Sequence, residues 1–407
     1  MRCRLSSLWG RYGRSLFAHT SYQLAARVYT AGSQLVAYAL VGALGSDSLV
    51  ATFALSMAAA GLVATAVDFG SGLWVVRHAA RGIPLPRLAI VRAAAMLVSA
   101  VALLVAATVG LVPWVMAPLI LVVGVVIGCS NFWRGVLWAR LHHEREAVAA
   151  VIQATVLVAT IGLAMAQRLD WPVAPLAAAA IAYGVGYLMR RVMSYAMVQS
   201  AESFVGLRQW IREAYSYAGQ ALVVTAQTQV DLLLLGGLWG GPTAGVAAYG
   251  LAMRFYYAIG MPFEALGTAI MPRVAVEKRI WWTRILKVAV ATACLAVVAM
   301  LLLTSAGQVF GLSASASAYL ETVGIILLLA LPFRFAAYVL GAVVTGIGRQ
   351  SARFTASAVG LTTMLVLDLL LIPSKGPYGA AIALVCADLA LGVGYSLAAR
   401  RSLSLAR

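Results

Sequence analysis

Long apolar segments recur along the whole chain, each separated from the next by a turn signal or a cluster of charges. A helix needs about 20 apolar residues to cross a bilayer. Each segment reaches that length without the strict alternation of a barrel strand. The segments lie at 20–43, 49–74, 88–110, 114–138, 146–167, 172–196, 215–239, 243–271, 283–305, 318–346, 351–373 and 377–399. The sequence therefore predicts an all-α polytopic membrane protein with twelve transmembrane helices.

The composition excludes a soluble domain and gives no sign of an enzyme. Hydrophobic residues make up 63% of the chain and charged residues 11%, against about 45–50% and about 25% in soluble domains. The four cysteines are scattered without disulfide or metal-ligand spacing, and no histidine is paired with a nucleophile. No phosphate-binding loop is present in the sequence. We therefore predict no catalytic site, no metal and no cofactor.

The distribution of positive charge predicts the orientation of the helices. Most of the 30 lysines and arginines fall in alternate connections, and Arg134, Arg190 and Arg353 are interpreted as members of these basic connections. By the positive-inside rule the basic side is cytoplasmic, so both termini are expected in the cytoplasm. The net charge of +17 then reflects topology and attraction to anionic lipid headgroups. It predicts no nucleic-acid partner.

An acid and an arginine occur at the same spacing in both halves of the chain. Asp68 and Arg77 in "LVATAVDFGSGLWVVRHAAR" return 196 residues later as Glu264 and Arg273. Two parallel six-helix repeats follow, with a substrate path expected at their interface. The predicted regions are a basic interfacial N-terminus (1–19), an N-lobe (20–199), a cytoplasmic linker (200–214), a C-lobe (215–399) and a cytoplasmic tail (400–407).

The first helix of each lobe carries a polar stripe at helical spacing. The stripes contain Gln23, Arg27, Thr30 and Gln34 in the N-lobe, and Gln220, Gln227 and Asp231 in the C-lobe. Lipid cannot satisfy these groups. They are expected either to face a central cavity or to form a hydrogen-bonded seam between helices.

Three charged residues lie near the middle of predicted C-lobe helices: Arg254, Arg334 and Asp388. Insertion scales place the cost of each at about 2.5–3.5 kcal/mol unless it is paired or hydrated. One interpretation is mutual neutralisation, for example of Arg254 by Asp231. The other is that the arginines hold an anionic substrate group while Asp388 and Asp368 balance them.

Three stretches carry a resemblance to a known family. They are "LVGALGSDSLVATFALSMAAAGLVATAVDFGSGLWVVRHAAR", "DLLLLGGLWGGPTAGVAAYGLAMRFYYAIGMPFEALGTAIMPRVA" and "GRQSARFTASAVGLTTMLVLDLLLIPSKGPYGAAIALVCADL". They resemble the polysaccharide and O-antigen (Wzx-type) flippases of the multidrug/oligosaccharidyl-lipid/polysaccharide flippase superfamily. The shared features are an aromatic-rich second helix, a "DFG"-like element followed by arginine, and a proline–basic exit from helix 8. The likeness extends over most of residues 20–400.

The resemblance implies a twelve-helix flippase of the bacterial inner membrane with a central cationic cavity. Its substrate would be an oligosaccharide on undecaprenyl diphosphate, moved from the cytoplasmic to the external leaflet. Arg27, Arg254 and Arg334 would face the diphosphate, and Gln23, Gln34, Gln220 and Gln227 the sugar hydroxyls. Membrane lipids and other polysaccharide-assembly proteins would be its partners, and the intramembrane acids suggest a proton or sodium gradient.

Two other classes stay open at the level of sequence. One is an ion-coupled small-solute transporter of the major-facilitator or multidrug type, although the compact Gly-Arg-Arg motif of the major facilitators is absent after the second helix. The other is a non-transporting membrane scaffold. Asp68, Arg77, Glu264 and Arg273 are interpreted either as a cytoplasmic gate or as plain anchors at the lipid boundary.

Overall fold

A computed structural model describes residues 2–78, 85–140, 142–167, 172–195, 207–277, 298, 310–346 and 349–404. Within these ranges the side chains of 2–20, 262–277 and 400–404, and of some single residues such as Gln23 and Arg77, are not described. The predicted crossing at 283–305 lies outside the described residues, apart from Val298. The statements below concern the described part of the chain.

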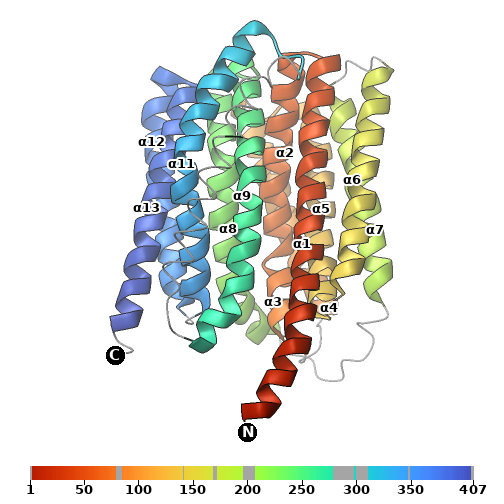
Figure 1. The fold of residues 1–407 in the computed structure, drawn as a ribbon. Helices are drawn as coiled ribbons and strands as arrows, with labels where there is room; N and C mark the ends of the chain where they lie inside the picture. The colour runs from red at the N-terminus through yellow and green to blue at the C-terminus, as the bar shows by residue number, and fades with distance from the viewer. Residues whose placement is uncertain are drawn as a thin grey trace.

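The described residues form α-helices that run side by side, with both termini at one end of the molecule (Figure 1). The first half contains α1 (Arg2–Leu44), α2 (Asp47–Asp68), α3 (Ser71–His78), α4 (Leu85–Thr108), η2 (Trp114–Met116), α5 (Ala117–Ala139), α6 (His143–Ala166) and α7 (Val173–Tyr195). The second half contains α8 (Leu207–Leu238), α9 (Ala244–Glu277), α11 (Ala314–Gly346), α12 (Gln350–Lys375) and α13 (Pro377–Ser404). Nine of the described helices are long and apolar enough to cross a membrane. The chain is an all-α polytopic membrane protein.

Helix contacts reproduce the repeat that the sequence predicts. We call α1–α7 the N-lobe and α8–α13 the C-lobe. In the N-lobe α1 packs on α6, α2 on α5, and α7 on both α5 and α6. The corresponding pairs of the C-lobe are α8 with α12, α9 with α11, and α13 with both α11 and α12. Across the interface, α2 meets α8 and α9, and α1 meets α9. Two lobes of the same topology therefore face each other about a pseudo-two-fold axis.

One predicted helix is broken. The segment 49–74 was expected to be continuous, but α2 ends at Asp68 and α3 begins at Ser71. Phe69 and Gly70 adopt positive φ values of 47° and 67°, a region that L-residues rarely adopt. The Asp68 carboxylate accepts hydrogen bonds from the Ser71 hydroxyl (2.7 Å) and the Gly72 amide (3.2 Å). These side-chain contacts at the start of α3 stabilise the break, because short polar side chains compete with helix hydrogen bonds.

Several helix extents differ from the predicted boundaries. α1 runs as one helix from Arg2 through the segment expected at the interface. α8 begins at Leu207, inside the predicted linker, and α9 continues to Glu277. Sequence periodicity marks the apolar core of a helix, whereas its polar ends lie beyond the apolar run.

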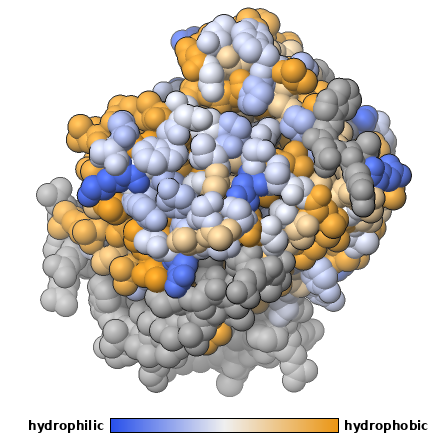
Figure 2. Space-filling view, turned by 90° about the horizontal axis from the view of Figure 1, so that it is seen from above, coloured by the Kyte–Doolittle hydropathy of each residue, from blue (hydrophilic) through white to orange (hydrophobic). Residues whose placement is uncertain are grey.

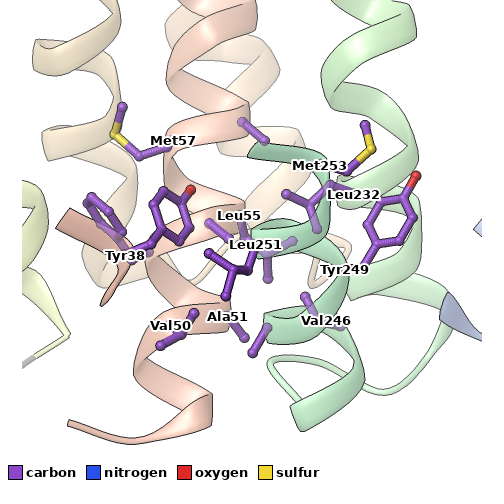
Figure 3. Close-up of a cluster of buried hydrophobic side chains, with 14 of the residues drawn as sticks. Tyr38, Val50, Ala51, Leu55, Met57, Leu232, Val246, Tyr249, Leu251 and Met253 are labelled. Atoms are coloured by element: carbon purple, nitrogen blue, oxygen red, sulfur yellow. The ribbon is translucent and has the colours of Figure 1, made fainter. Parts of the chain in front are cut away.

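The lobes are sealed against each other at the end opposite the termini, which we call the sealed end. Side chains of α2 and α9, including Val50, Leu55, Val246 and Leu251, meet there (Figure 3). A Cβ atom added at Gly250 would lie 2.7 Å from the Ala54 Cβ atom, so the absence of a side chain permits this close approach. Seen from that end, hydrophilic residues gather over the centre and hydrophobic residues around the rim (Figure 2). This distribution is expected of a membrane protein viewed along its helices.

Candidate functional site

A cavity of about 700 Å³ lies between the lobes, on the termini side of the seal. This volume is in the range of ligand-binding sites, about 300–1,000 Å³. Among the described residues, six arginines line it: Arg27 (α1), Arg134 (α5), Arg190 (α7), Arg254 (α9), Arg334 (α11) and Arg353 (α12). The acids in the described lining are Asp68 and Glu146. Charged residues inside a membrane protein are costly and mark functional sites. Each lobe contributes three of the arginines, so the described lining is strongly cationic.

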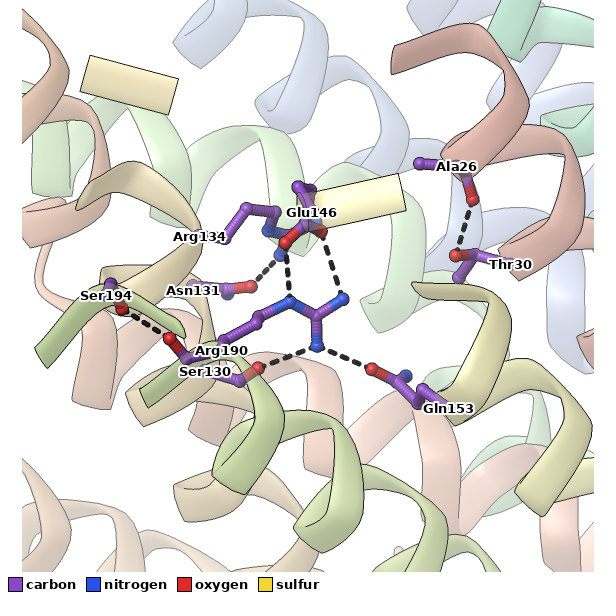
Figure 4. Close-up of polar contacts among 9 residues, drawn as sticks. All are labelled: Ala26, Thr30, Ser130, Asn131, Arg134, Glu146, Gln153, Arg190 and Ser194. Carbon is purple, nitrogen blue, oxygen red and sulfur yellow. Dashed lines mark hydrogen bonds and ion pairs between the residues drawn. The ribbon is translucent and has the colours of Figure 1, made fainter. Parts of the chain in front are cut away.

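Four hydrogen bonds hold the Arg190 guanidinium in a buried network of the N-lobe (Figure 4). Its Nε and Nη2 atoms donate to the two carboxylate oxygens of Glu146 at 2.8 and 3.0 Å. Its Nη1 atom donates to Ser130 Oγ at 3.0 Å and to Gln153 Oε1 at 2.6 Å. A bidentate arginine–carboxylate ion pair is among the strongest hydrogen-bonded pairs. Arg190 is therefore neutralised in place and joins α5, α6 and α7.

Arg334 has a different environment in the C-lobe. Its Nη1 atom donates to Asp388 Oδ1 at 2.8 Å, and the Tyr256 hydroxyl donates to the other carboxylate oxygen. The guanidinium lies against the rings of Tyr257 (5.3 Å) and Tyr338 (5.1 Å). Its Nε atom is buried without a hydrogen-bond partner among the described residues. Arg334 thus combines one carboxylate contact with two cation–π contacts. The contact with Asp388 agrees with the prediction that this acid balances the charge of an arginine.

Three other arginines of the cavity interact with neutral groups. Arg254 donates from Nε to the Tyr38 hydroxyl at 3.4 Å and lies 5.5 Å from that ring. Arg134 donates to the side-chain oxygen of Asn131. Arg353 donates from Nη1 to Thr345 Oγ1 at 2.8 Å. No acid lies within 4 Å of these three guanidinium groups in the described part of the chain. Arg254 is not paired with Asp231, which was the neutralisation considered from the sequence.

The structure brings five of the eight predicted substrate-binding residues to the cavity: Arg27, Arg254, Arg334, Gln34 and Gln227. Gln34 donates to the Tyr183 hydroxyl at 3.1 Å, and Tyr183 also lines the cavity.

Two of the remaining three pack inside the C-lobe, away from the cavity lining. Gln220 donates to Ser357 Oγ at 3.1 Å, and Asp231 accepts from Tyr249 and from the Leu232 amide. For these two residues the second possibility considered from the sequence holds, namely hydrogen bonding between neighbouring helices. The third, Gln23, has a side chain outside the described set.

Of the predicted gating residues, Asp68 lines the cavity beside the break between α2 and α3. Arg77 lies in α3, and Glu264 and Arg273 lie in α9; their side chains are outside the described set. α9 is helical through position 264, whereas α2 ends at Asp68. The two copies of the motif therefore differ in backbone structure.

The interpretation of Arg134, Arg190 and Arg353 as members of basic connections is wrong. All three lie within helices and line the cavity, as does Glu146. The sequence contained one indication that these arginines lie in helices, since their positions fall inside or at the edge of predicted apolar segments. A second signal is the repeat: Arg134 and Arg334 are 200 residues apart, and Arg190 and Asp388 are 198 apart. A charge-count rule does not distinguish an arginine in the last turns of a helix from one in a loop.

Three buried acids lie in the C-lobe: Asp388 pairs with Arg334, Asp231 is within electrostatic range of Arg334, and Asp368 is within range of Asp231. Asp231, Asp368 and Asp388 are each fully buried. Asp368 is within electrostatic range of Asp231, and both of its carboxyl oxygens lack a hydrogen-bond partner among the described residues. A buried charge without a partner is unstable and is expected to bind a proton or a cation.

Comparison with known proteins gives a fold rather than a family. No family model matches the sequence, and no curated protein matches it. The eukaryotic MATE transporter AtDTX14 is 16% identical, with a TM-score of 0.65 over 98% of this chain and 100% of that one. The lipid II flippase MurJ, in an inward closed conformation, is 12% identical, with a TM-score of 0.66 over 95% and 89%. The Vibrio cholerae MATE transporter VcmN in its bent form is 16% identical, with a TM-score of 0.61 over 96% and 97%.

The chain has the fold of these transporters and of this flippase. One related structure is described as a multidrug resistance MATE family transporter of the MOP superfamily. The likeness favours this fold over the major-facilitator alternative that the sequence left open. The matched proteins are transporters and a flippase rather than enzymes.

Proposed function

We propose that the protein is a flippase that moves an undecaprenyl-diphosphate-linked oligosaccharide from the cytoplasmic to the external leaflet of a bacterial inner membrane. The observation that carries the proposal is the cavity, whose described lining contains six arginines and two acids. In the proposed orientation both termini lie in the cytoplasm, and the sealed end is then the external side. The N-lobe (20–199) and the C-lobe (215–399) are then the two bodies that rock about the substrate.

The chemistry of the lining fits the two parts of such a substrate. Guanidinium groups match phosphate oxygens in charge and geometry, and Arg254 has no carboxylate competing for it among the described residues. Gln34, Gln227 and Tyr183 offer neutral donors and acceptors to sugar hydroxyls. Membrane lipids would contact the acyl carrier, and other polysaccharide-assembly proteins are proposed partners.

The charge of the cavity separates this proposal from multidrug transport. An organic cation entering the cavity would meet six arginines of the described lining. Of the two acids described there, Glu146 is already bound by Arg190. Like charges in a low-dielectric cavity repel strongly. An anionic substrate is therefore favoured over a cationic drug.

We propose that the energy source is a proton or sodium gradient acting through Asp368 and Asp231. Asp368 supports this role because it is buried with both oxygens lacking a partner among the described residues. Binding of a cation by Asp368 and Asp231 would change the charge at Asp231, which is within electrostatic range of Arg334 on α11. In this way the state of the C-lobe would depend on the gradient.

We also propose that Asp68, Arg77, Glu264 and Arg273 gate the cytoplasmic side of the cavity. The support is that Asp68 lines the cavity and stabilises the break after α2. Cysteine accessibility inside the cavity should change in a variant carrying Asp68→Asn and Glu264→Gln. Unchanged accessibility and transport would leave the anchoring interpretation.

The test is rescue of a bacterial strain that lacks its own oligosaccharide-lipid flippase. The wild-type chain should restore external glycan. Arg254→Gln should reduce export about tenfold or more, because a hydrogen bond to a charged group contributes about 1.5–3 kcal/mol and 1.4 kcal/mol is tenfold. Carrier-linked oligosaccharide should then accumulate on the cytoplasmic face.

Arg191→Gln is the matched control, since Arg191 is exposed and does not line the cavity. It should rescue as well as the wild type. Normal export by an expressed Arg254→Gln variant would contradict the cationic-cavity proposal, whereas failure of the expressed wild type to restore export would favour a scaffold role.

A further inference from the structure

Arg134 and Arg353 lie nearer the termini end than the arginine proposed to bind the substrate. Arg254 is ten residues into α9, which begins at the sealed end, so it lies about 15 Å from that end of the helix. Arg134 is seventeen residues from the sealed end of α5, a distance of about 26 Å along the helix. Arg353 is twenty-two residues from the sealed end of α12, a distance of about 33 Å. We call the part of the cavity at this level the mouth. The cavity therefore has arginines at two depths.

The two mouth arginines belong to opposite lobes and have donors available. Arg353 makes one hydrogen bond, to Thr345, and its Nε atom is buried without a partner among the described residues. Arg134 donates to Asn131. Arg353 is also in the first turn of α12, where the helix dipole favours a negative charge. Both guanidinium groups thus face the cavity without a directly bonded carboxylate among the described residues.

The acids near Arg134 do not cancel this charge. Glu146, Asp68, Arg27 and Arg190 are within electrostatic range of Arg134. Glu146 accepts hydrogen bonds from the Nε and Nη2 atoms of Arg190, and one oxygen of Asp68 accepts from Ser71 and Gly72. Counting the described residues, this N-lobe wall has three arginines and two acids, which gives an excess positive charge. The facing wall adds Arg353.

We propose that Arg134 and Arg353 form a second anion site at the mouth, where one phosphate-bearing ligand bridges the two lobes and closes the mouth. Like charges on opposite walls repel, and moving the walls together would also remove water from both arginines. An anion that accepts hydrogen bonds from both guanidinium groups removes the repulsion and links the lobes. The inference rests on the proposed function in taking the ligand to be a diphosphate. It adds a site at which arrival of the ligand drives the conformational change.

The test measures the distance between the lobes in the full-length purified protein with inorganic diphosphate as the probe. Spin labels are attached through Tyr195→Cys on α7 and Ser351→Cys on α12, both exposed and close to the termini end. The four native cysteines are replaced by serine. Diphosphate should shorten the distance between the labels. Arg134→Gln and Arg353→Gln should each abolish the shortening, whereas Arg191→Gln should retain it.

A charge exchange gives a second measurement. Arg134→Glu should pair with Arg353 and shorten the distance without diphosphate. Adding Arg353→Glu should restore repulsion and the longer distance. A wild-type distance that does not respond to diphosphate, or a response that survives both glutamine substitutions, would overturn the proposal. So would an Arg134→Glu distance equal to that of the unliganded wild type.

Failure of the mouth site and failure of the proposed function give different results. If the wild type rescues glycan export but diphosphate does not move the lobes, the mouth site is wrong and the flippase proposal stands. If diphosphate closes the mouth through Arg134 and Arg353 but the chain rescues no glycan export, the mouth site stands and the substrate assignment is wrong.

Discussion

Each lobe has three charged residues on helices that correspond between the lobes, but the acid lies on a different helix in each lobe. In the N-lobe they are Arg134 on α5, Glu146 on α6 and Arg190 on α7. In the C-lobe they are Arg334 on α11, Arg353 on α12 and Asp388 on α13. Each set has two arginines and one acid. The repeat has therefore kept the composition of the set while exchanging the charges at two of its positions.

The two ion pairs differ in how completely they are hydrogen-bonded. Glu146 accepts from Arg190 through both oxygens, and Ser130 and Gln153 accept two further hydrogen bonds from the Arg190 Nη1 atom. Asp388 contacts Arg334 through one oxygen, and the Arg334 Nε atom has no partner among the described residues. A saturated network fixes its helices, whereas a partly satisfied one has alternative partners. This difference indicates a rigid N-lobe and a C-lobe in which charge can be rearranged.

The largest expected effect comes from breaking the N-lobe pair. Glu146→Gln leaves Arg190 buried without a counter-ion, and removal of one partner from a buried pair costs about 3–5 kcal/mol. The free energy of unfolding in detergent should fall by that amount. Glu144→Gln is the control, because Glu144 is exposed and, within the described part of the chain, its ion pair is with His142 at 3.1 Å. Exposed pairs contribute about 0–1 kcal/mol. Equal losses for the two variants would show that the network does not stabilise the lobe.

Breaking the C-lobe pair should cost less. Asp388→Asn removes the carboxylate from Arg334, but the rings of Tyr257 and Tyr338 remain and Asp231 is within electrostatic range. We expect a loss of about 2 kcal/mol, below the range for a buried arginine left alone. The measurement is the same unfolding titration, with Glu146→Gln run beside it. A loss larger than that of Glu146→Gln would reverse the proposed contrast between the lobes.

A second difference between the lobes concerns the repeated acid. Asp68 stabilises the break between α2 and α3, whereas α9 continues as a helix through Glu264. Asp68→Ala removes the acceptor for the Ser71 hydroxyl and the Gly72 amide, which should cost about 1 kcal/mol, as for loss of a helix cap. Thermal unfolding checks this value. Asp68→Asn keeps an acceptor oxygen and should retain most of the stability; an equal loss would mean that charge rather than hydrogen bonding stabilises the break.

The sequence predicted the fold in most respects because a membrane imposes long apolar segments. Eleven of the twelve expected crossings correspond to described helices, and the repeat at Asp68 and Glu264 predicted two lobes. The break at Phe69 was not predicted, because apolar periodicity continues across it. It depends on one carboxylate and a short turn, and neither alters hydropathy.

The candidate site was predicted only in part. Arg254 and Arg334 were identified because they interrupt the middle of apolar segments. Arg134, Arg190 and Arg353 were not, since near a helix end an arginine in a cavity and one in a loop have the same sequence context. The partner of Arg254 was also unpredictable: Asp231 is on the preceding helix, but the structure places Tyr38 of the other lobe beside it. Contacts between lobes depend on packing that one sequence does not encode locally.

The smallest change in stability should come from Asp368, where the structure shows no hydrogen bond to lose. Its carboxyl oxygens are buried without partners among the described residues, so Asp368→Asn removes a group that is costly to ionise. The free energy of unfolding should stay within about 0.5 kcal/mol of wild type or rise. Asp231→Asn is the comparison, because it weakens contacts from Tyr249 and Leu232 and should destabilise the protein.

If Asp368 is the coupling acid, glycan export by Asp368→Asn should also no longer respond to collapse of the proton or sodium gradient. A variant that is destabilised yet retains its response to the gradient would assign Asp368 a structural role and leave the coupling step to another acid.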